Sequence, residues 1–184
     1  MEKEGFKLEN VSVRLVQESP IYSEVPILMP DDAIRAVGSE MASFDREVLA
    51  VINLDIHGRP INVSYLSVGT LDNSLAHPRD MLKVSILSNA NRVILLHCHP
   101  SGILIPSSDD IKLTDRMNKV YAMVGILLVD HIIFGGRNLE EYFSFCSKGL
   151  LKFPDVKYAT DCSQIELPGL MVAEGRQSLP TSRK

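Results

Sequence analysis

Two histidines, a serine and a carboxylate stand close together in residues 97–110, which read HCHPSGILIPSSDD. The run before them is apolar and is expected to be a buried strand. Because side chains alternate between the two faces of a strand, His97 and His99 should point to one side and Cys98 to the other. Two imidazoles and the carboxylate of Asp110 are ligands of the kind that zinc takes at catalytic sites, where a fourth position is left for water.

Each of these residues also has a purely structural explanation. A His-x-His pair can be two polar residues at the end of a strand. Asp110 falls in the first turn of an expected helix, where a carboxylate caps the backbone or interacts with the helix dipole, although Asp109 can do the same. Ser107 is also a candidate cap, as is Ser108. Taken alone, these residues leave metal binding and helix capping both open.

The longer pattern resembles the JAMM (MPN-plus, JAB) metalloprotease domain and, within that family, the RadC-like branch. The family pattern is an upstream Glu, then His-x-His-Pro, then Ser-x-x-Asp. This chain has every element in that order, at Glu47, His97, His99, Pro100, Ser107 and Asp110. The resemblance spans roughly Met29 to Ser147 and includes four further runs, SVGTL at 67–71, HPRD at 77–80, SNA at 88–90 and DHIIFGG at 130–136. It implies zinc-dependent hydrolysis of peptide or isopeptide bonds, with His97, His99 and Asp110 as zinc ligands.

The resemblance also assigns the family's catalytic glutamate to Glu47, at the head of the run EVLAVINLD. A metal lowers the pKa of its bound water to about 7. A nearby carboxylate can then take the proton and pass it to the leaving amine. Glu40 is the alternative carboxylate, although its expected helical setting suits the role less well. Ser107 is placed to hydrogen-bond the oxyanion of a tetrahedral intermediate or to hold the water.

The remaining histidines and Cys98 are interpreted as peripheral to the metal site. His131 lies in an expected buried strand and is interpreted as a core histidine rather than a ligand. His77 precedes an expected helix and is a candidate for a hydrogen bond near the site, whereas His57 lies in a turn. Cys98 stands where RadC-like relatives commonly have a polar residue, and we interpret it as a small buried side chain.

The segment 103–105 (ILI) also departs from the family, because relatives usually have a more polar loop there. This departure leaves loop packing and substrate choice open, but not the ligands. Full-length RadC proteins also carry an N-terminal helix-hairpin-helix region, and the residues before Glu47 are too few to form one.

The hydrophobic pattern predicts helices and strands that alternate along the chain. Helices are expected over 31–41, 79–89 and 108–124, and strands over 11–15, 47–54, 61–68, 92–97, 126–134 and 141–145. This order predicts an α/β sandwich with a mixed sheet between helices, in agreement with the MPN/JAB, cytidine-deaminase-like fold that the resemblance implies.

Three parts are expected along the chain: an N-terminal strand and connection at 1–28, a RadC-like JAB/MPN domain at 29–148, and a C-terminal tail at 149–184. Prolines and glycines recur in the tail, and its end, EGRQSLPTSRK, is polar. We therefore expect part of the tail to be disordered.

Composition limits the compartment and the partners. The net charge of −4 argues against strong binding of nucleic acid, which requires clustered Lys and Arg. The three cysteines are an odd number at wide spacing and suit a reducing compartment. No apolar run is long enough to span a membrane, and the N-terminus lacks the apolar part of a signal peptide. A cytoplasmic protein with no membrane contact is expected.

Three functions compete for this site. The first is a zinc metallopeptidase or isopeptidase whose partner is an unidentified peptide or protein substrate. The second, suggested by the traditional name of the RadC family, is a non-hydrolytic accessory in DNA repair or mobile-element DNA processing. The third is a metal-dependent phosphoesterase, which usually needs more His and Asp ligands downstream than this chain offers. The sequence leaves the oligomeric state open, a homodimer included.

Overall fold

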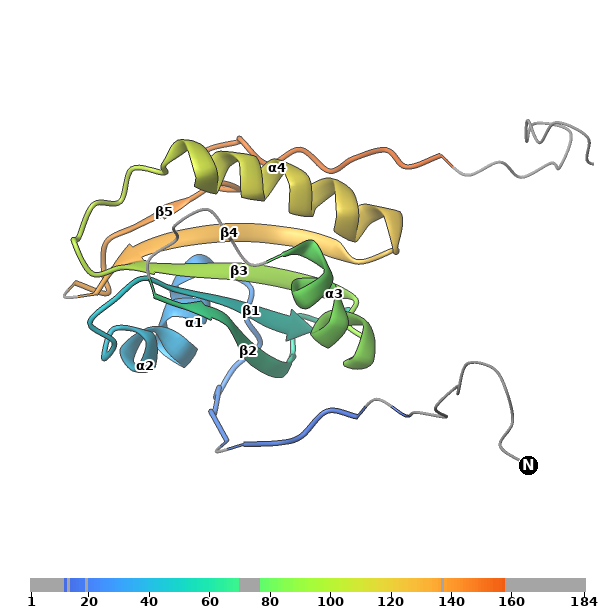
Figure 1. Ribbon diagram of the computed structural model, residues 1–184, viewed down its shortest axis with the longest axis horizontal. Coiled ribbons are helices and arrows are strands. Elements are labelled where there is room, and N and C mark those ends of the chain that lie inside the picture. The colour runs from blue at the N-terminus through green and yellow to red at the C-terminus, as the bar shows by residue number, and fades with distance from the viewer. Residues whose placement is uncertain (1–11, 13, 19, 70–76, 137, 158–184) are drawn as a thin grey trace, which may run out of the picture. The chain divides into compact units, whose positions relative to one another are not determined.

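A five-stranded mixed sheet forms the centre of the computed structural model, which describes residues 12, 14–18, 20–69, 77–136 and 138–157. The strands are β1 (Val48–Leu54), β2 (Pro60–Val68), β3 (Arg92–His99), β4 (Leu127–Gly135) and β5 (Tyr142–Ser144). Their order across the sheet is β2-β1-β3-β4-β5, and the pair β3–β4 is parallel while the other pairs are antiparallel. The predicted mixed sheet is confirmed, with β3 in its centre (Figure 1).

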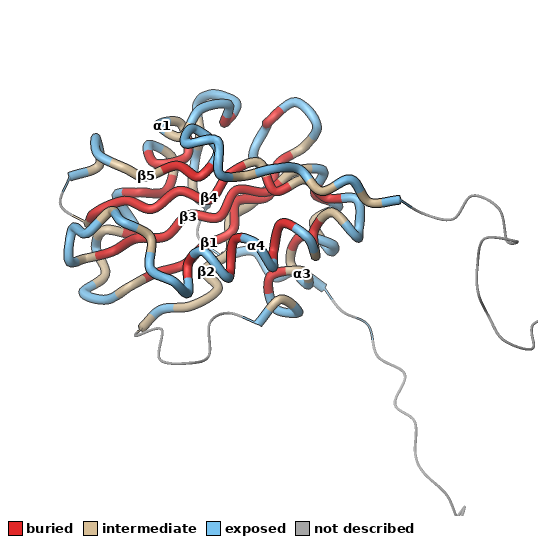
Figure 2. The backbone as a smooth tube through the Cα atoms, turned by 90° about the horizontal axis from the view of Figure 1, so that it is seen from above, coloured by how far each residue is buried: buried red, intermediate tan, exposed pale blue. Residues whose placement is uncertain are grey.

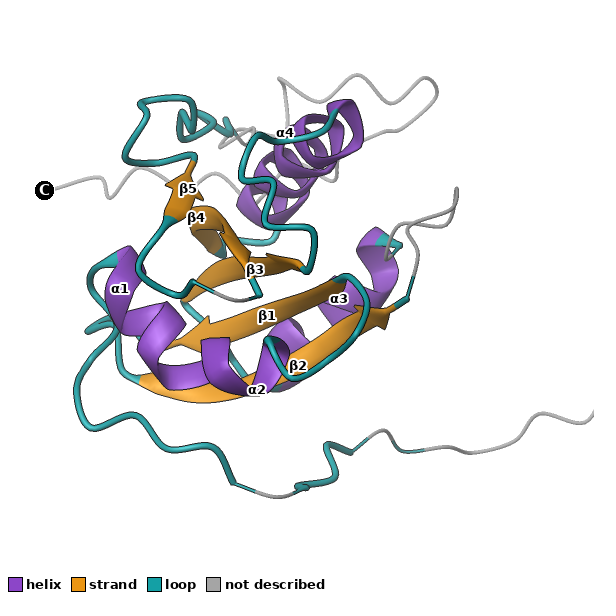
Figure 3. Ribbon diagram, turned by 90° about the vertical axis from the view of Figure 1, so that its left-hand side faces the viewer, coloured by secondary structure: helices purple, strands orange, loops and turns teal. Residues whose placement is uncertain are grey.

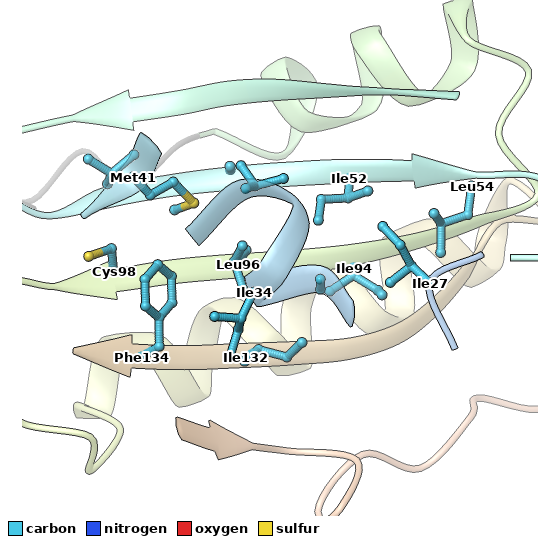
Figure 4. Close-up of a cluster of buried hydrophobic side chains, with 14 residues drawn as sticks. Ile27, Ile34, Met41, Ile52, Leu54, Ile94, Leu96, Cys98, Ile132 and Phe134 are labelled. Carbon is cyan, nitrogen blue, oxygen red and sulfur yellow. The ribbon is translucent and has the colours of Figure 1, made fainter. Parts of the chain in front are cut away.

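One face of the sheet is covered by a helical run that follows Met29. The run consists of α1 (Pro30–Ala33), a π-helical stretch η1 (Ile34–Gly38) and α2 (Ser39–Met41). Its inner side chains Ile34, Val37 and Met41 are buried against the sheet, as the predicted helix requires. Figure 4 shows Ile34 and Met41 over side chains from β1, β3 and β4. We call this side of the sheet the α1–α2 face (Figure 3).

The opposite face is covered by α3 (Pro78–Leu87) and α4 (Ser108–Met123), and we call it the α3–α4 face. Met81 of α3 and Met117 and Tyr121 of α4 pack there in one buried cluster with Leu49 of β1 and Leu95 of β3. Strands between two helical layers are buried on both sides, and β1 and β3 are almost wholly buried (Figure 2). The α/β sandwich predicted from the sequence is therefore confirmed.

The N-terminal strand predicted at 11–15 does not form in the part of the chain that the structure describes. Val11 and Val13 lie outside the described residues, and Ser12, Arg14 and Leu15 belong to no strand. An alternating pattern specifies which side chains share a face, but it does not supply a neighbouring strand for the backbone hydrogen bonds.

The predicted disorder of the tail concerns residues 158–184, which lie outside the described residues. Residues 150–157 run without regular secondary structure. Contacts divide the chain into a unit ending at Pro154 and a second unit from Asp155, and every helix and strand named above belongs to the first. Among the described residues, no helix has both the length and the apolar character needed to cross a bilayer.

Candidate metal centre

The end of β3 places two imidazoles on one face of the sheet. Leu95 packs in the buried cluster of the α3–α4 face, whereas Leu96 and Cys98 pack in that of the α1–α2 face. By strand alternation His97 and His99 share the face of Leu95, and Cys98 points away from them, as the sequence predicts. β3 continues through His99, so both histidines are part of the strand rather than of the loop that follows it.

Glu47 reaches the same face because β1 pairs with β3. The two strands are antiparallel with Leu49 opposite His97, and Leu49 packs in the cluster of the α3–α4 face. Glu47 precedes Leu49 by two residues and therefore lies on the same side. Its Oε2 is 3.8 Å from His97 Nε2, and its side chain is 37% exposed while that of His97 is fully buried. Glu47 thus lies between the buried imidazole and the solvent.

The alternative carboxylate, Glu40, lies on the other side of the sheet. It belongs to α2, which covers the α1–α2 face. Burial and then the Glu40 carboxylate raise the pKa of Tyr65, a β2 residue that packs against the cluster of that face. The sheet therefore separates Glu40 from His97 and His99, and of the two glutamates only Glu47 is close to an imidazole.

Asp110 and Ser107 cap the first turn of α4 and also lie against the histidines. Asp110 Oδ2 accepts hydrogen bonds from the Ser107 backbone N–H at 2.8 Å and from its hydroxyl at 2.6 Å, while Ser107 Oγ accepts from the Asp110 N–H at 3.1 Å. The other carboxylate oxygen, Oδ1, is 2.8 Å from His97 Nδ1, and Oδ2 is 3.9 Å from His99 Nε2. The capping explanation and the site explanation are therefore compatible for both residues.

The pKa of Asp110 is set by two opposed effects. Burial of its carboxylate would raise that pKa, but the contact with His97 and the hydrogen bonds from Ser107 outweigh burial and hold the pKa well below its ordinary value. Asp110 is therefore an anion although only 1% of the residue is exposed. A buried anion beside two imidazoles provides the negative charge that a divalent cation would neutralise.

His99 is oriented by a backbone contact that the sequence did not predict. Its Nδ1 lies 2.7 Å from the carbonyl oxygen of Ile103, which can only accept, so Nδ1 carries the hydrogen and Nε2 keeps its lone pair. Gly102 makes the intervening turn with φ +77°, and its N–H donates to the His99 carbonyl at 2.9 Å. Metal-ligating histidines are commonly oriented by such a contact, so the turn after β3 prepares His99 Nε2 as a ligand atom.

Buried polar atoms without partners concentrate around His97. Within the described residues, both ring nitrogens of His97 and Oδ1 of Asp110 lack a hydrogen bond, so the close Nδ1–Oδ1 contact is not aligned as one. Leaving a buried polar group unsatisfied costs about 1–3 kcal/mol. Imidazole nitrogens and a carboxylate oxygen are the donors that zinc prefers. The residues present therefore fit a zinc ion.

The candidate ligand atoms fall into two compact groups, with His97 in both. One group is Glu47, His97 and His99, and the other is His97, Asp110 and His131; in each, one ligand atom per residue lies within 4.8 Å of the others. The predicted ligands His97, His99 and Asp110 thus lie near one another in pairs. They do not form one group, because His99 belongs to the first group and Asp110 to the second. We call the first group the outer position and the second the inner position.

His131 is the residue that sequence reasoning underestimated. It is fully buried, its Nδ1 is 2.7 Å from Thr114 Oγ1, and its Nε2 has no hydrogen-bond partner in the described part of the chain. Burial, followed by the charge of His97, lowers its pKa to about 3, so the ring is neutral. The sequence contained the residue but not the pairing of β4 beside β3 that brings it to His97. His131 is therefore buried in its strand as predicted, but only one of its two ring nitrogens has a hydrogen-bond partner among the described residues.

The two other histidines have local roles. His77 is the N-cap residue of α3, and its Nδ1 accepts from the Arg79 N–H at 3.2 Å, so its hydrogen bond goes to its own helix. His57 lies in the turn between β1 and β2, as the sequence predicts, and it is exposed.

Comparisons with known proteins identify the family of this chain. A profile of the RadC-like JAB domain matches residues 27–150. The chain is 39% identical over 138 residues to a UPF0758 protein of Desulfitobacterium hafniense, which covers 75% of this chain and 59% of the relative. It is 43% identical over 112 residues to a UPF0758 protein of Thermotoga maritima, which covers 61% of this chain and 49% of the relative. The chain thus spans about half to three-fifths of the length of these relatives. The match over both helical layers, the sheet and every candidate ligand shows that the chain belongs to the RadC-like JAB domain family.

Proposed function

We propose that this protein is a zinc-dependent metallohydrolase of the JAMM type that cleaves peptide or isopeptide bonds in an unidentified peptide or protein. The observation that carries the proposal is the partly exposed Glu47 carboxylate, 3.8 Å from Nε2 of the fully buried His97. At the outer position we assign His97 and His99 as ligands and Glu47 as the base rather than as a third ligand. A general base must reach both the metal-bound water and the substrate, and the partial exposure of Glu47 beside a buried imidazole supports this role.

Zinc, when bound, would acidify a water molecule and polarise the substrate carbonyl. Glu47 would take one proton from the attacking water while the water oxygen bonds to the carbonyl carbon. Glu47 returns the proton to the nitrogen as the C–N bond breaks, which leaves a carboxylic acid and an amine. His97 and His99 offer nitrogen ligands, and Asp110 supplies the balancing negative charge.

Ser107 is proposed to serve the oxyanion. Its hydroxyl donates to Asp110 Oδ2 in this structure, and its backbone N–H donates to the same oxygen. The hydroxyl can therefore turn towards a developing oxyanion while the N–H keeps Asp110 in place. One reaction then gives a part to every predicted site residue: Glu47 as base, His97 and His99 as ligands, Asp110 as the balancing charge and Ser107 as the oxyanion donor.

The test compares Glu47→Gln with Glu40→Gln, a matched change on the opposite side of the sheet. Zinc-loaded proteins are incubated with a peptide library and with lysine isopeptides, and products are identified by mass spectrometry. Because Gln cannot accept the proton, Glu47→Gln should keep its zinc and lose a factor of about 10²–10⁴ in turnover. Glu40→Gln should cleave at the wild-type rate. Cleavage by Glu47→Gln at the wild-type rate, or no cleavage by the zinc-loaded wild type, would contradict the proposal.

We also infer that the protein works in a reducing compartment, and we place it in the cytoplasm. The two cysteines that the structure describes, Cys98 and Cys146, are free thiols, which supports this placement.

A further inference from the structure

We propose that His131 completes a second, inner cation position with His97 and Asp110, suited to zinc or another divalent metal of the same borderline character. The proposal goes beyond the hydrolase function, because the reaction described above does not use His131. It rests on the face that His131 occupies, on the tautomer that its partner imposes, and on the unpartnered atoms that surround it.

An irregularity in β4 puts His131 on the face of the metal centre. The register between β3 and β4 shifts between Val93 and Ile94, and beyond the shift Leu95 lies beside His131. Leu128 packs in the cluster of the α3–α4 face, whereas Ile132, four residues later, packs in that of the α1–α2 face. Regular alternation would keep these two residues on one face. The shift adds one residue to β4, which reverses the alternation beyond it and places His131 on the side of His97.

A short hydrogen-bond chain fixes the tautomer of His131. The Thr114 hydroxyl donates to the backbone carbonyl of Asp110 at 2.6 Å. A hydroxyl has one hydrogen, so Thr114 Oγ1 must accept in its 2.7 Å contact with His131 Nδ1. Nδ1 therefore carries the hydrogen of the neutral ring, and Nε2 is left with its lone pair. No described residue hydrogen-bonds to that lone pair, although the ring is fully buried.

The unpartnered atoms of the three residues converge. His97, Asp110 and His131 are each at most 1% exposed, and one ligand atom from each lies within 4.8 Å of the others. The atoms without an aligned hydrogen bond include Nε2 of His131 and the pair Nδ1 of His97 and Oδ1 of Asp110, which lie 2.8 Å apart. Two imidazole nitrogens and one carboxylate oxygen are a donor set for zinc. A cation is the partner that would satisfy all three atoms at once.

The inner and outer positions share the ring of His97. A neutral imidazole has one lone pair, at either Nδ1 or Nε2. His97 can therefore offer Nδ1 to the inner position or Nε2 to the outer one, but not both. We expect one metal ion per chain, distributed between the two positions, rather than two ions bound at once.

The test uses variants that each remove one position. Metal-free full-length protein is titrated with Co²⁺, whose visible absorption reports its ligands, and bound zinc is counted after gel filtration. His99→Ala removes the outer position and should still bind one equivalent of Co²⁺. Adding His131→Phe to His99→Ala should lower the affinity for Co²⁺ by a factor of about 10–100 or more. Phe retains a flat ring against Phe145, whose ring centroid is 5.2 Å from that of His131, and His131→Gln provides a second variant if Phe prevents folding.

His77→Phe in the His99→Ala background is the matched control, because His77 caps α3 and belongs to neither position. It should bind Co²⁺ as His99→Ala does. The proposal is overturned if His99→Ala binds no Co²⁺, or if its affinity and spectrum are unchanged by both His131 replacements. Neither result depends on peptide cleavage, so failure of the inner position is distinguishable from failure of the proposed hydrolase function.

Discussion

The two faces of β3 differ in what they bury. On the α1–α2 face β3 contributes Ile94, Leu96 and Cys98, all buried, to a hydrophobic cluster (Figure 4). On the α3–α4 face the cluster is apolar around Leu95, but at the end of β3 it gives way to buried His97 and His99. The comparison indicates that the two faces of one strand serve different purposes. The apolar face provides hydrophobic stability, and the other face holds polar groups that only a ligand would satisfy.

The largest expected effect separates two adjacent residues on these faces. His97→Ala removes the residue that both metal positions share, so bound zinc should be lost and turnover should fall by more than about 10²-fold. Cys98→Ala, its neighbour on the apolar face, should retain both. Zinc content and cleavage rate are measured for the two variants side by side. Equal loss in both would show that the faces are not independent.

Leu96→Ala should instead damage the fold and spare the metal. Leu96 is fully buried on the α1–α2 face. Removing such a side chain leaves a cavity and should lower the free energy of unfolding by about 2–5 kcal/mol. Ile86→Ala, at a position 53% exposed on α3, is the control and should change stability by less than about 0.5 kcal/mol. Urea denaturation and a Co²⁺ titration are run on each protein. A weakened metal affinity in folded Leu96→Ala would break the proposed separation.

Acid should reveal the charge buried on the polar face. The pKa of Asp110 is lowered from 3.8 in the folded chain, so its ionised form adds stability that is fully present above about pH 4 and is lost as the pH falls through the lower folded pKa. The unfolding free energy of metal-free Asp110→Asn should therefore decline less steeply below pH 4 than that of the wild type. Asp55→Asn, in the β1–β2 turn, is the less buried comparison, since the pKa of Asp55 is also lowered by hydrogen bonds. An identical acid dependence of Asp110→Asn and wild type would contradict the assignment.

The smallest effect concerns the thiols. Burial, followed by the charge of Glu47, raises the pKa of Cys98 to about 11, whereas Cys146 is exposed. The thiolate is the reactive form. Iodoacetamide at pH 8 should therefore label Cys146 in the native protein and leave Cys98 unlabelled until urea unfolds the chain. Peptide mapping by mass spectrometry measures both sites, and early labelling of Cys98 would show that the apolar face opens in the native state.

The parts of the centre that the sequence predicted are those that follow from local geometry. Alternation in a strand is enough to place His97 and His99 together and Cys98 apart. The catalytic role of Glu47 was predicted from the family pattern alone. Its location near the histidines follows from the antiparallel pairing of β1 with β3. His131 could not be placed, because its face depends on a parallel pairing and on an irregularity in β4 that strand alternation does not contain.

Helix capping and a place in the metal centre are not exclusive alternatives, because Ser107 and Asp110 cap α4 while Asp110 also lies against His97. One residue can serve as a helix cap and contact a histidine at the same time, because a carboxylate has two oxygens. Asp110 uses Oδ2 to cap α4 and presents Oδ1 to His97. A residue type that suits a helix terminus can therefore also be a candidate ligand, and spacing alone does not separate the two roles.

The central place of β3 has a consequence for the newly made chain. Glu47 becomes a neighbour of the histidines only when β1 has paired with β3, and His131 only when β4 has joined on the other side. A ribosome releases these segments one after another, so a partly synthesised protein holds its imidazoles and its glutamate apart. A hydrolase built in this way would stay inert early in its own synthesis, and its activity would begin only when β1, β3 and α4 have come together.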